Sequence, residues 1–145
     1  MNVLVFVDTN VLLYAIDAAD PAKQRAAGAW RARLWQERAG RVSFQVLHEF
    51  YAQVTRKTRE RGSLQKARQE VRDLTAWRPV ASDVAILERA WALQDRYRLP
   101  FWDALIVASA LSVPCRFLLS EDFQHGQDLD GLVVVSPFRA EPGSL

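Results

Sequence analysis

The sequence predicts an α/β fold, with a central, mostly parallel sheet of four to five strands between layers of helices. Two observations lead to this prediction. Short apolar runs rich in Val and Leu alternate along the chain with longer segments whose apolar residues recur at helical spacing. The first run, residues 3–7, is apolar on both faces, as in a strand of a parallel sheet that helices cover above and below.

The composition is that of an ordinary globular protein. Half of the 145 residues are hydrophobic and a quarter are charged, so we expect one domain with a core over residues 1–145 and exclude a disordered chain. No apolar run approaches the ~20 residues of a membrane helix, and residues 3–7 are too few for a signal-peptide core. The single cysteine, Cys115, excludes an internal disulfide, and we expect a cytoplasmic protein.

The charges are unevenly placed along the chain. Residues 21–72 carry 13 Lys or Arg against four Glu, a balance of +9, whereas the remainder has a balance of −7. A basic surface suits a polyanion, and an acidic cluster suits a metal ion. Solvated helix faces would give the same counts, so the asymmetry alone leaves both interpretations open.

The first part of the chain predicts a strand and two helices. The strand over residues 3–7 is followed by a short apolar helix over residues 11–16. Asp20 and Pro21 are typical of a helix start, with Asp as N-cap and Pro at the first helical position. This second helix is predicted to reach about residue 39 and to end at Gly40. One side of it carries Trp30, Leu34 and Trp35.

A short strand and two helices are predicted next. The strand lies around residues 41–44, and the helix after it covers residues 45–57. The apolar stripe of that helix consists of Val46, Leu47, Phe50, Tyr51 and Val54. After a charged connection, Ser63 is predicted to cap a fourth helix that reaches about Thr75.

The remaining elements alternate in the same way. Residues 77–80 are predicted as a short strand, and Ser82 as the cap of a helix that ends before Pro100 and turns Val84, Leu87 and Trp91 inward. Residues 102–111 are apolar nearly all round, which predicts a buried helix. Residues 115–119 and 132–135 are predicted as strands, and residues 137–145 as a tail.

Acidic residues follow two of the predicted strands. Asp8 comes directly after the first strand, and Glu121 and Asp122 come just after residues 115–119. Parallel strands end at one edge of a sheet, where ligands bind, and the helix that begins near Asp103 should start at that edge too. Each acid alone has a local explanation: an Asx turn for Asp8, a helix cap for Asp103 and a turn for Asp122. Together they indicate a site.

Gathering these carboxylates requires a cation. Two carboxylates ~4 Å apart repel by about 4 kcal/mol at an effective dielectric constant of about 20, and a hard divalent ion offsets this repulsion. Oxygen ligands suit Mg²⁺ or Mn²⁺, whereas one Cys and two His do not provide a zinc set. The sequence therefore predicts a magnesium or manganese site at Asp8, Asp103 and Asp122.

Two other sets of titratable residues have weaker support. Glu49 lies away from the middle of its helix's apolar stripe, as a solvated side chain would. His48 and His125 could form an acid–base pair for metal-free RNA cleavage, but no other feature supports such a pair, and His48 fits a surface position better.

Four short motifs match a known family in their order along the chain: a strand ending in VDTN, then HEF, FWDALIVASA and LLSEDFQHG. From about residue 3 to residue 138 the sequence resembles the PIN domain, and more narrowly the VapC-type ribonuclease toxins of bacterial toxin–antitoxin pairs. The resemblance implies a three-layer α/β/α PIN-like fold. It also implies a catalytic quartet of Asp8, Glu49, Asp103 and Asp122, supported by Thr9, Asn10, Ser120 and Glu121.

The last motif departs from the family pattern. The family often spaces its final Asp two residues before a Phe, whereas Phe123 follows Asp122 directly here and Glu121 stands on the other side. Which of the two acids faces the metal is therefore left open.

The resemblance further implies a Mg²⁺- or Mn²⁺-dependent endoribonuclease that acts as a toxin, forms a homodimer and binds a small antitoxin protein. The basic part of the chain would contact RNA phosphates, through Arg56, Lys57, Arg59, Arg61, Lys66 and Arg68. Two alternatives stay open. One is a non-catalytic PIN-like RNA-binding scaffold. The other is a phosphatase with Asp8 as nucleophile, although Asn10 stands where such an enzyme would have a second Asp.

Overall fold

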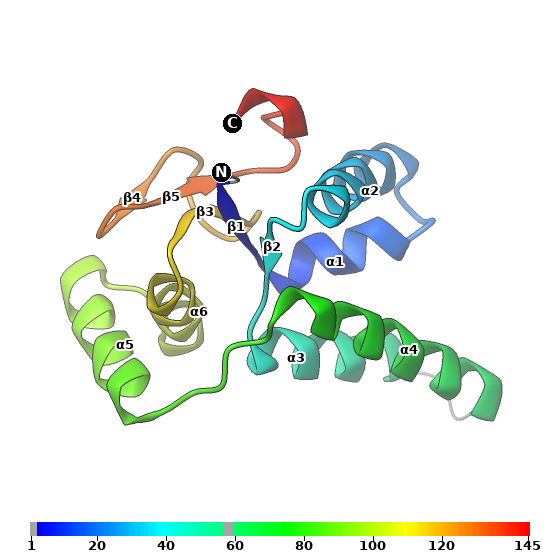
Figure 1. The fold of residues 1–145 in the computed structure, drawn as a ribbon, viewed down its shortest axis with the longest axis horizontal. Helices are drawn as coiled ribbons and strands as arrows, with labels where there is room; N and C mark the ends of the chain where they lie inside the picture. The colour runs from blue at the N-terminus through cyan, green and yellow to red at the C-terminus, as the bar shows by residue number, and fades with distance from the viewer. Residues whose placement is uncertain (1–2, 57–59) are drawn as a thin grey trace.

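The structure is a computed structural model that describes residues 3–56 and 60–145. Within these residues one five-stranded sheet has the order β2-β1-β3-β5-β4 (Figure 1). All neighbouring strands are parallel except β4 and β5. The strands are β1 (Leu4–Val7), β2 (Gly40–Arg41), β3 (Cys115–Leu119), β4 (Asp128–Leu129) and β5 (Leu132–Val135). The prediction of a mostly parallel sheet is confirmed.

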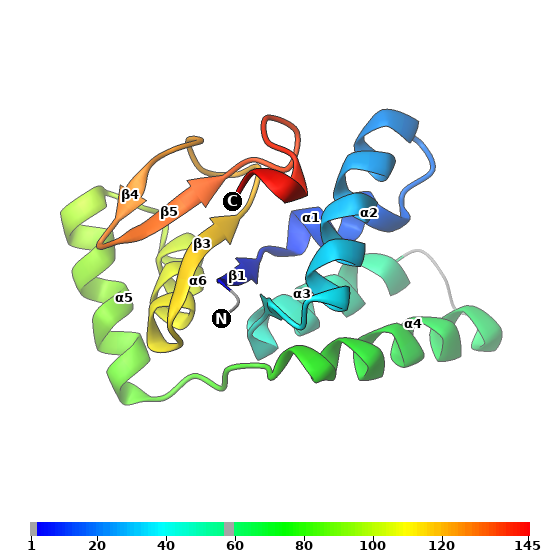
Figure 2. The same cartoon turned by 45° about the horizontal axis from the view of Figure 1, so that its top comes forward.

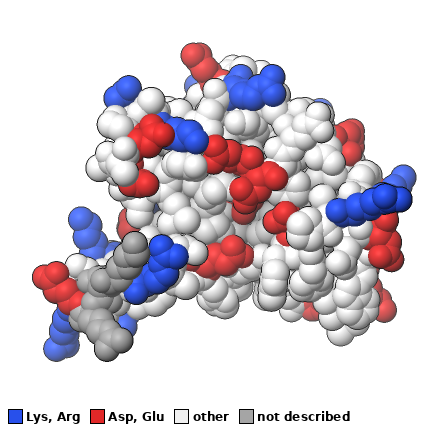
Figure 3. Space-filling view, turned by 180° about the vertical axis from the view of Figure 1, so that it is seen from behind, with Lys and Arg blue, Asp and Glu red and all other residues white. Residues whose placement is uncertain are grey.

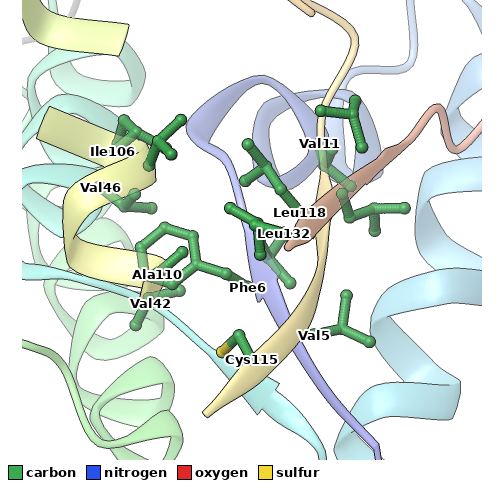
Figure 4. Packing of buried hydrophobic residues seen from close by; sticks show 14 of the residues in the cluster. Val5, Phe6, Val11, Val42, Val46, Ile106, Ala110, Cys115, Leu118 and Leu132 are labelled. Atoms are coloured by element: carbon green, nitrogen blue, oxygen red, sulfur yellow. The ribbon is translucent and has the colours of Figure 1, made fainter. Parts of the chain in front are cut away.

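Six α-helices in the described part of the chain pack around this sheet (Figure 2). They are α1 (Thr9–Ile16), α2 (Pro21–Gln36), α3 (Phe44–Thr55), α4 (Arg61–Leu74), α5 (Val84–Tyr97) and α6 (Phe101–Ser112). Strand β1 is covered on both faces, because Phe6 points toward Ala110 of α6 while Val5 points to the opposite side (Figure 4). The double burial explains the unbroken apolar run that opens the chain, and the three-layer arrangement is the predicted one.

The two strands predicted around residues 41–44 and 77–80 are shorter or absent. Strand β2 is only Gly40–Arg41, because the Ser43 side chain accepts a hydrogen bond from the Val46 amide and starts α3. Residues Thr75–Trp77 form a 3₁₀ helix, so the predicted strand at residues 77–80 is wrong. Arg78 adopts a left-handed backbone conformation (φ 53°), which interrupts extended chain, and Val80 alone forms a bridge to Ser43.

Strand β4 was not predicted from the sequence. It forms a short hairpin with β5 through Asp130 and Gly131, both of which have positive φ angles (54° and 97°). An Asp-Gly pair between apolar runs is a recognised signal for such a turn, so the sequence did contain the information.

Helix α2 ends earlier than predicted, and Gly40 is not its terminator. The backbone turns at Arg38, whose φ of 55° closes the helix, and Gly40 is already in β2. A Cβ atom at Gly40 would lie 2.5 Å from the Trp77 ring. Glycine is therefore required at this position by the close approach of a buried indole. Of the predicted apolar face, Trp30 and Leu34 are buried and Trp35 is half-exposed.

The predicted caps of α4 and α5 are each wrong by one to three residues. Helix α4 begins at Arg61, so Ser63 lies within its first turn. Asp83, rather than Ser82, caps α5 by accepting a hydrogen bond from the Ile86 amide. The predicted inward face of α5 is also wrong, since Ile86, Ala90 and Leu93 are buried, whereas Val84 and Trp91 are exposed.

The last helix and the C-terminal segment complete the core. Every residue of α6 from Ala104 to Ala110 is buried, as predicted. Residues 137–145 are not a free tail, because the Trp30 indole N–H donates to the Ala140 carbonyl (3.0 Å) and Pro142–Ser144 form a 3₁₀ turn. Among the helices that the structure describes, none is both long and apolar enough to cross a membrane.

The charges also separate in space. Figure 3 shows one face of the molecule on which Asp and Glu side chains gather across the middle, while Lys and Arg lie toward the margins. The acids that follow the strands in the sequence predict an acidic area of this kind.

Candidate active site

Asp8 lies at the carboxyl end of β1 and caps α1. Its Oδ1 accepts a hydrogen bond from the Thr9 amide (2.8 Å), and its Oδ2 accepts from the Ser120 hydroxyl (2.7 Å) and the Asn10 amide (3.3 Å). The side chain is 5% exposed. Burial raises the pKa of Asp8 to about 6, against the opposing effect of the Ser120 and Thr9 hydrogen bonds. The nearby carboxylates of Asp122 and Glu49 raise this pKa further.

Ser120 and Asn10 join the ends of β1 and β3. The Asn10 side chain donates to the Ser120 hydroxyl (3.3 Å) and accepts from the Glu121 amide (3.2 Å). The Ser120 oxygen also accepts from the Asp122 amide (3.0 Å). Ser120 is fully buried. These bonds fix the segment that carries Glu121 and Asp122 against Asp8, so the two strand ends form one rigid edge.

Asp103 is in the first turn of α6, where a negative charge interacts favourably with the helix dipole. It is not the N-cap, because Pro100 occupies that position. Burial raises the pKa of the half-buried Asp103 carboxyl, and the charges of Asp122 and Glu49 raise it as well. The local explanation by capping therefore does not account for this residue.

Glu49 reaches the same edge from α3. The Thr9 hydroxyl donates to its Oε2 (3.5 Å), and the Gln45 side-chain amide donates to its Oε1 (2.8 Å). Glu49 is exposed, yet its charge raises the pKa of both Asp8 and Asp103. Helical periodicity did not select this residue, whereas the family resemblance did.

Glu121 and Asp122 point to different partners. Lys23 forms an ion pair with Glu121 (2.8 Å), and its hydrogen bond holds the pKa of Glu121 below the usual value. The same ammonium group lies over the rings of Tyr14 and Phe138, at 4.8 and 4.9 Å from their centroids. Asp122, and not Glu121, is the acid whose charge raises the pKa of Asp8 and Asp103. Asp122 therefore acts on the other two acids, whereas the charge of Glu121 is compensated by Lys23.

The donor set formed by Asp8, Glu49, Asp103 and Asp122 suits a hard divalent cation in chemistry and charge. All four provide carboxylate oxygens, and none of them forms an ion pair with a Lys or Arg of residues 3–56 and 60–145. As the side chains stand, no three acids, histidines or cysteines of these residues lie close enough together to bind one ion. Binding of one cation would therefore require these carboxylates to move closer together.

The other predicted residues that the structure describes lie at the end of α3, on α4 and in the segment after β3. Arg56 ends α3, and Arg61, Lys66 and Arg68 are exposed on α4, where Arg68 donates to the Tyr51 hydroxyl (3.0 Å). Lys57 and Arg59 lie outside the described residues. The Nδ1 atom of His125 accepts a hydrogen bond from the Ser136 amide (3.0 Å), which gives this histidine a structural role.

Gln45 and Trp102 were not assigned to the site from the sequence. The Gln45 amide nitrogen donates both to Glu49 and to the Trp102 carbonyl (3.3 Å), so it joins α3 to the start of α6. The i, i+4 spacing of Gln45 and Glu49 on one helix was the only available signal. The contact with Trp102, 57 positions along the chain, could not be inferred from spacing.

Comparisons with known proteins agree with this architecture. The sequence profile of the PIN domain matches residues 5–127, and no curated protein matches the chain in sequence. A toxin–antitoxin complex from Klebsiella pneumoniae is similar with a TM-score of 0.66 and 21% identity, over 94% of this chain and 99% of that one. FitAcB from Neisseria gonorrhoeae gives a TM-score of 0.73 and 16% identity, over 94% and 100%. VapBC2 from Rickettsia felis, in a structure bound to a DNA fragment from its promoter, has a TM-score of 0.64 and 13% identity, over 90% of this chain and 96% of that one. At these identities the likeness shows the fold alone.

Proposed function

The chain belongs to the PIN domain family, and on that premise we propose that it is a Mg²⁺- or Mn²⁺-dependent endoribonuclease that acts as the toxin of a VapBC-type toxin–antitoxin pair. The observation that carries the proposal is unbalanced negative charge at the sheet edge. Asp8 is 5% exposed, Asp122 and Glu49 act on it electrostatically, and no ion pair neutralises it in the described part of the chain. A nuclease that uses a cation needs such a site.

The residues of the site have distinct roles in this proposal. Asp8, Asp103 and Asp122 would hold the cation, and a bound cation lowers the pKa of its water ligand so that hydroxide can attack the phosphodiester. Ser120 and Thr9 donate hydrogen bonds that orient the Asp8 carboxylate. Glu49, exposed at the rim, can exchange a proton with bulk water.

RNA would be held by its phosphates on the basic surface of α3 and α4. Arg56, Arg61, Lys66 and Arg68 are exposed there, and Lys57 and Arg59 belong to the same predicted set. Contacts of this kind give affinity that falls steeply with salt and carry no sequence preference.

We further propose a small antitoxin as partner, a homodimer as the assembly and the cytoplasm as the location. Support for the antitoxin comes from the fold neighbours, which include toxin–antitoxin complexes, whereas the homodimer follows from the family resemblance alone. An antitoxin would inhibit by placing a cationic side chain on the acidic edge. Growth arrest on expression that a small neighbouring gene relieves is the expected result; no arrest and no such gene would contradict the toxin assignment.

The enzymatic proposal is tested by incubating antitoxin-free protein with total cellular RNA, in Mg²⁺ or Mn²⁺ and in EDTA. Discrete fragments that require metal and disappear in Asp103→Asn are expected. The matched control is Asp95→Asn, which alters an exposed carboxylate on α5 and should cleave like the wild type. Cleavage that survives both EDTA and Asp103→Asn would overturn the proposal.

RNA binding and a search for a covalent phosphate separate the two alternatives. Folded protein that binds RNA with either metal but never cleaves it would indicate the non-catalytic scaffold. A phosphatase with Asp8 as nucleophile would trap a covalent phosphate on that residue.

A further inference from the structure

A small pocket lies at the opposite edge of the sheet from the acidic site. Strand β2 runs parallel to β1, so the residues that precede β2 lie beyond the amino ends of these strands, whereas Asp8 follows the carboxyl end of β1. The pocket has a volume of about 300 Å³, and its lining residues are Trp35, Arg38, Arg41, Ala76, Trp77 and Arg78. The reaction proposed for the acidic edge uses none of them.

Three arginines meet in this pocket without an acid. Arg38 and Arg78 are exposed, whereas Arg41 is only 9% exposed. In the described part of the chain none of the three forms an ion pair with Asp or Glu. Burial lowers the pKa of Arg41, and the positive charge of Arg78 lowers it further. A buried charge is normally paired with one of opposite sign, so the pocket is suited to an anion that the described residues do not supply.

The Arg41 guanidinium is held in place and still has donors to offer. Its Nη1 atom donates to the carbonyls of Arg38 (3.2 Å) and Gly40 (2.7 Å), which fixes the side chain against the turn after α2. Its Nε and Nη2 atoms have no acceptor among the residues that the structure describes. They are also accessible, because the one fully buried side-chain atom without a partner in these residues is Gln45 Oε1. Such N–H groups form a planar fork that matches two oxygens of a phosphate.

Two indoles line the same pocket. Trp77 is buried against Gly40, and the ring of Trp35 packs on it with centroids 6.0 Å apart and an interplanar angle of 47°. Trp77 thus holds Trp35 at the rim, where Trp35 is 44% exposed. An exposed indole beside guanidinium groups can stack on a nucleobase whose phosphate the arginines contact. An acidic side chain would use the guanidinium groups but offers no flat π face to the indole.

We propose that this pocket binds a nucleotide, whose phosphate contacts the three arginines and whose base stacks on Trp35. The volume lies at the small end of ligand sites, which suits a single nucleotide unit. A free mononucleotide and one nucleotide of an RNA strand offer the same chemistry, and the test separates these two sources. The proposal does not depend on the proposed function, because neither a cation nor cleavage takes part at this edge of the sheet.

The test is calorimetric titration of the full chain with adenosine 5′-monophosphate, in EDTA so that no metal ion links the phosphate to the acidic edge. Adenosine, which lacks the phosphate, and inorganic phosphate, which lacks the base, should each bind at least about tenfold more weakly. Arg78→Gln should weaken binding of the nucleotide about tenfold, and Arg78→Lys should restore only part of it, because an ammonium group lacks the planar fork. Trp35→Ala should also cost about tenfold, and Trp35→Phe should restore most of it.

The chain offers a matched control for each variant. Arg98 is exposed and has nearly the same left-handed backbone as Arg78 (φ 56° against 53°), but it follows α5 outside the pocket. Trp91 is 49% exposed on α5 and serves as the control for Trp35. Arg98→Gln and Trp91→Ala should bind the nucleotide like the wild type. Equal affinities in Arg78→Gln and Arg98→Gln, or in Trp35→Ala and Trp91→Ala, would overturn the proposal.

Nuclear magnetic resonance of the wild type makes the test independent of the folding of any variant. Adenosine 5′-monophosphate should shift the indole N–H signals of Trp35 and Trp77 and leave those of Trp91 and Trp102 unchanged. A shift confined to Trp102, which precedes Asp103, would place the nucleotide at the acidic edge and contradict the proposal.

A short single-stranded oligoribonucleotide, titrated in the same way, identifies the source of the nucleotide. Tighter binding than that of the monophosphate, with the same dependence on Arg78 and Trp35, would support the proposal with an RNA strand as ligand. Weaker binding than that of the monophosphate would support it with a free nucleotide as ligand. An acidic peptide that requires Arg78, together with no binding of any nucleotide, would overturn the proposal and indicate a protein partner instead.

Discussion

Asp8 and Asp130 show how differently this molecule surrounds one type of residue. Asp130, in the β4–β5 turn, accepts hydrogen bonds from Tyr97 (2.6 Å) and Arg89 (3.2 Å) and pairs with Arg96. The Tyr97 hydrogen bond, with help from the two arginines, holds the pKa of Asp130 below its usual value. Asp8 accepts hydrogen bonds from neutral groups only, and burial raises its pKa to about 6.

The two sets of surroundings indicate a structural role for Asp130 and a functional role for Asp8. The surroundings of Asp130 stabilise its ionised form, so folding alone explains why this acid is there. The surroundings of Asp8 oppose ionisation, and two more carboxylates make the opposition stronger. A fold retains such a cost where the group has another task, which is why perturbed acids are candidates for functional sites.

The two acids should differ most in their effect on activity. Asp8→Asn should lower the single-turnover cleavage rate of a defined RNA by more than about 100-fold, because Asp8 is a proposed metal ligand and its loss should exceed the 10–100-fold typical for loss of a supporting residue. Asp130→Asn should stay within about twofold of the wild type, at a temperature where circular dichroism shows both variants folded. Similar losses in the two variants would show that the site is not at Asp8.

The next effect is on stability and has opposite sign at the two acids. The pKa of Asp8 rises from 3.8 to about 6 on folding, so its stabilising contribution is complete below 3.8 and is lost as the pH rises through about 6. A pKa difference of this size between the folded and unfolded chain corresponds to about 3 kcal/mol. Urea unfolding in EDTA measures this effect. Between acidic and neutral pH, the free energy of unfolding of Asp8→Asn should increase relative to that of the wild type by up to this amount. A difference in the free energy of unfolding between variant and wild type that does not change with pH would contradict the raised pKa of Asp8.

Asp130→Asn should destabilise the fold by about 1 kcal/mol at neutral pH, because its arginine partners are largely exposed and the Tyr97 hydrogen bond can be kept. The loss should diminish as the pH falls through the lowered pKa of Asp130, the reverse of the trend at Asp8. Urea unfolding at several pH values measures both. A constant loss down to strongly acidic pH would show that charge is not the cause.

The smallest effect concerns Glu121, which resembles Asp130 more than Asp8 because Lys23 neutralises it. Glu121→Gln should change the cleavage rate less than about threefold and stability by less than about 1 kcal/mol, since the ion pair is partly exposed. Asp122→Asn is the matched neighbour and should lower the rate as Asp8→Asn does. A larger loss in Glu121→Gln than in Asp122→Asn would reverse the assignment of the two acids.

Much of the sheet edge could be predicted, because each of its acids stands directly beside the strand or helix that positions it. Asp8 and Asp122 follow apolar strands, and Asp103 follows a helix start, so sequence alone could place them together. Local signals also explain why residues 115–119 and 132–135 were predicted with the observed bounds of β3 and β5.

The remaining features depend on contacts that no spacing encodes. Glu49 meets Thr9 40 positions away, and Gln45 meets Trp102 across α3 and α6. The inward face of α5 is set by its packing against α6, so Ile86, Ala90 and Leu93 are buried in place of Val84 and Trp91. Gly40 ended a helix in the prediction, whereas a distant indole is what requires it.

The bond between Ser120 and Asp8 spans 112 positions, which has a consequence for the order of events during synthesis. Strand β1 is translated well before its main neighbour β3, and before Ser120, which donates to Asp8. A nascent chain that has reached only α6 carries Asp8, Glu49 and Asp103 without the strand that aligns them. Folding of this edge is therefore among the latest steps, and a prematurely terminated product carries the acids without the assembled centre.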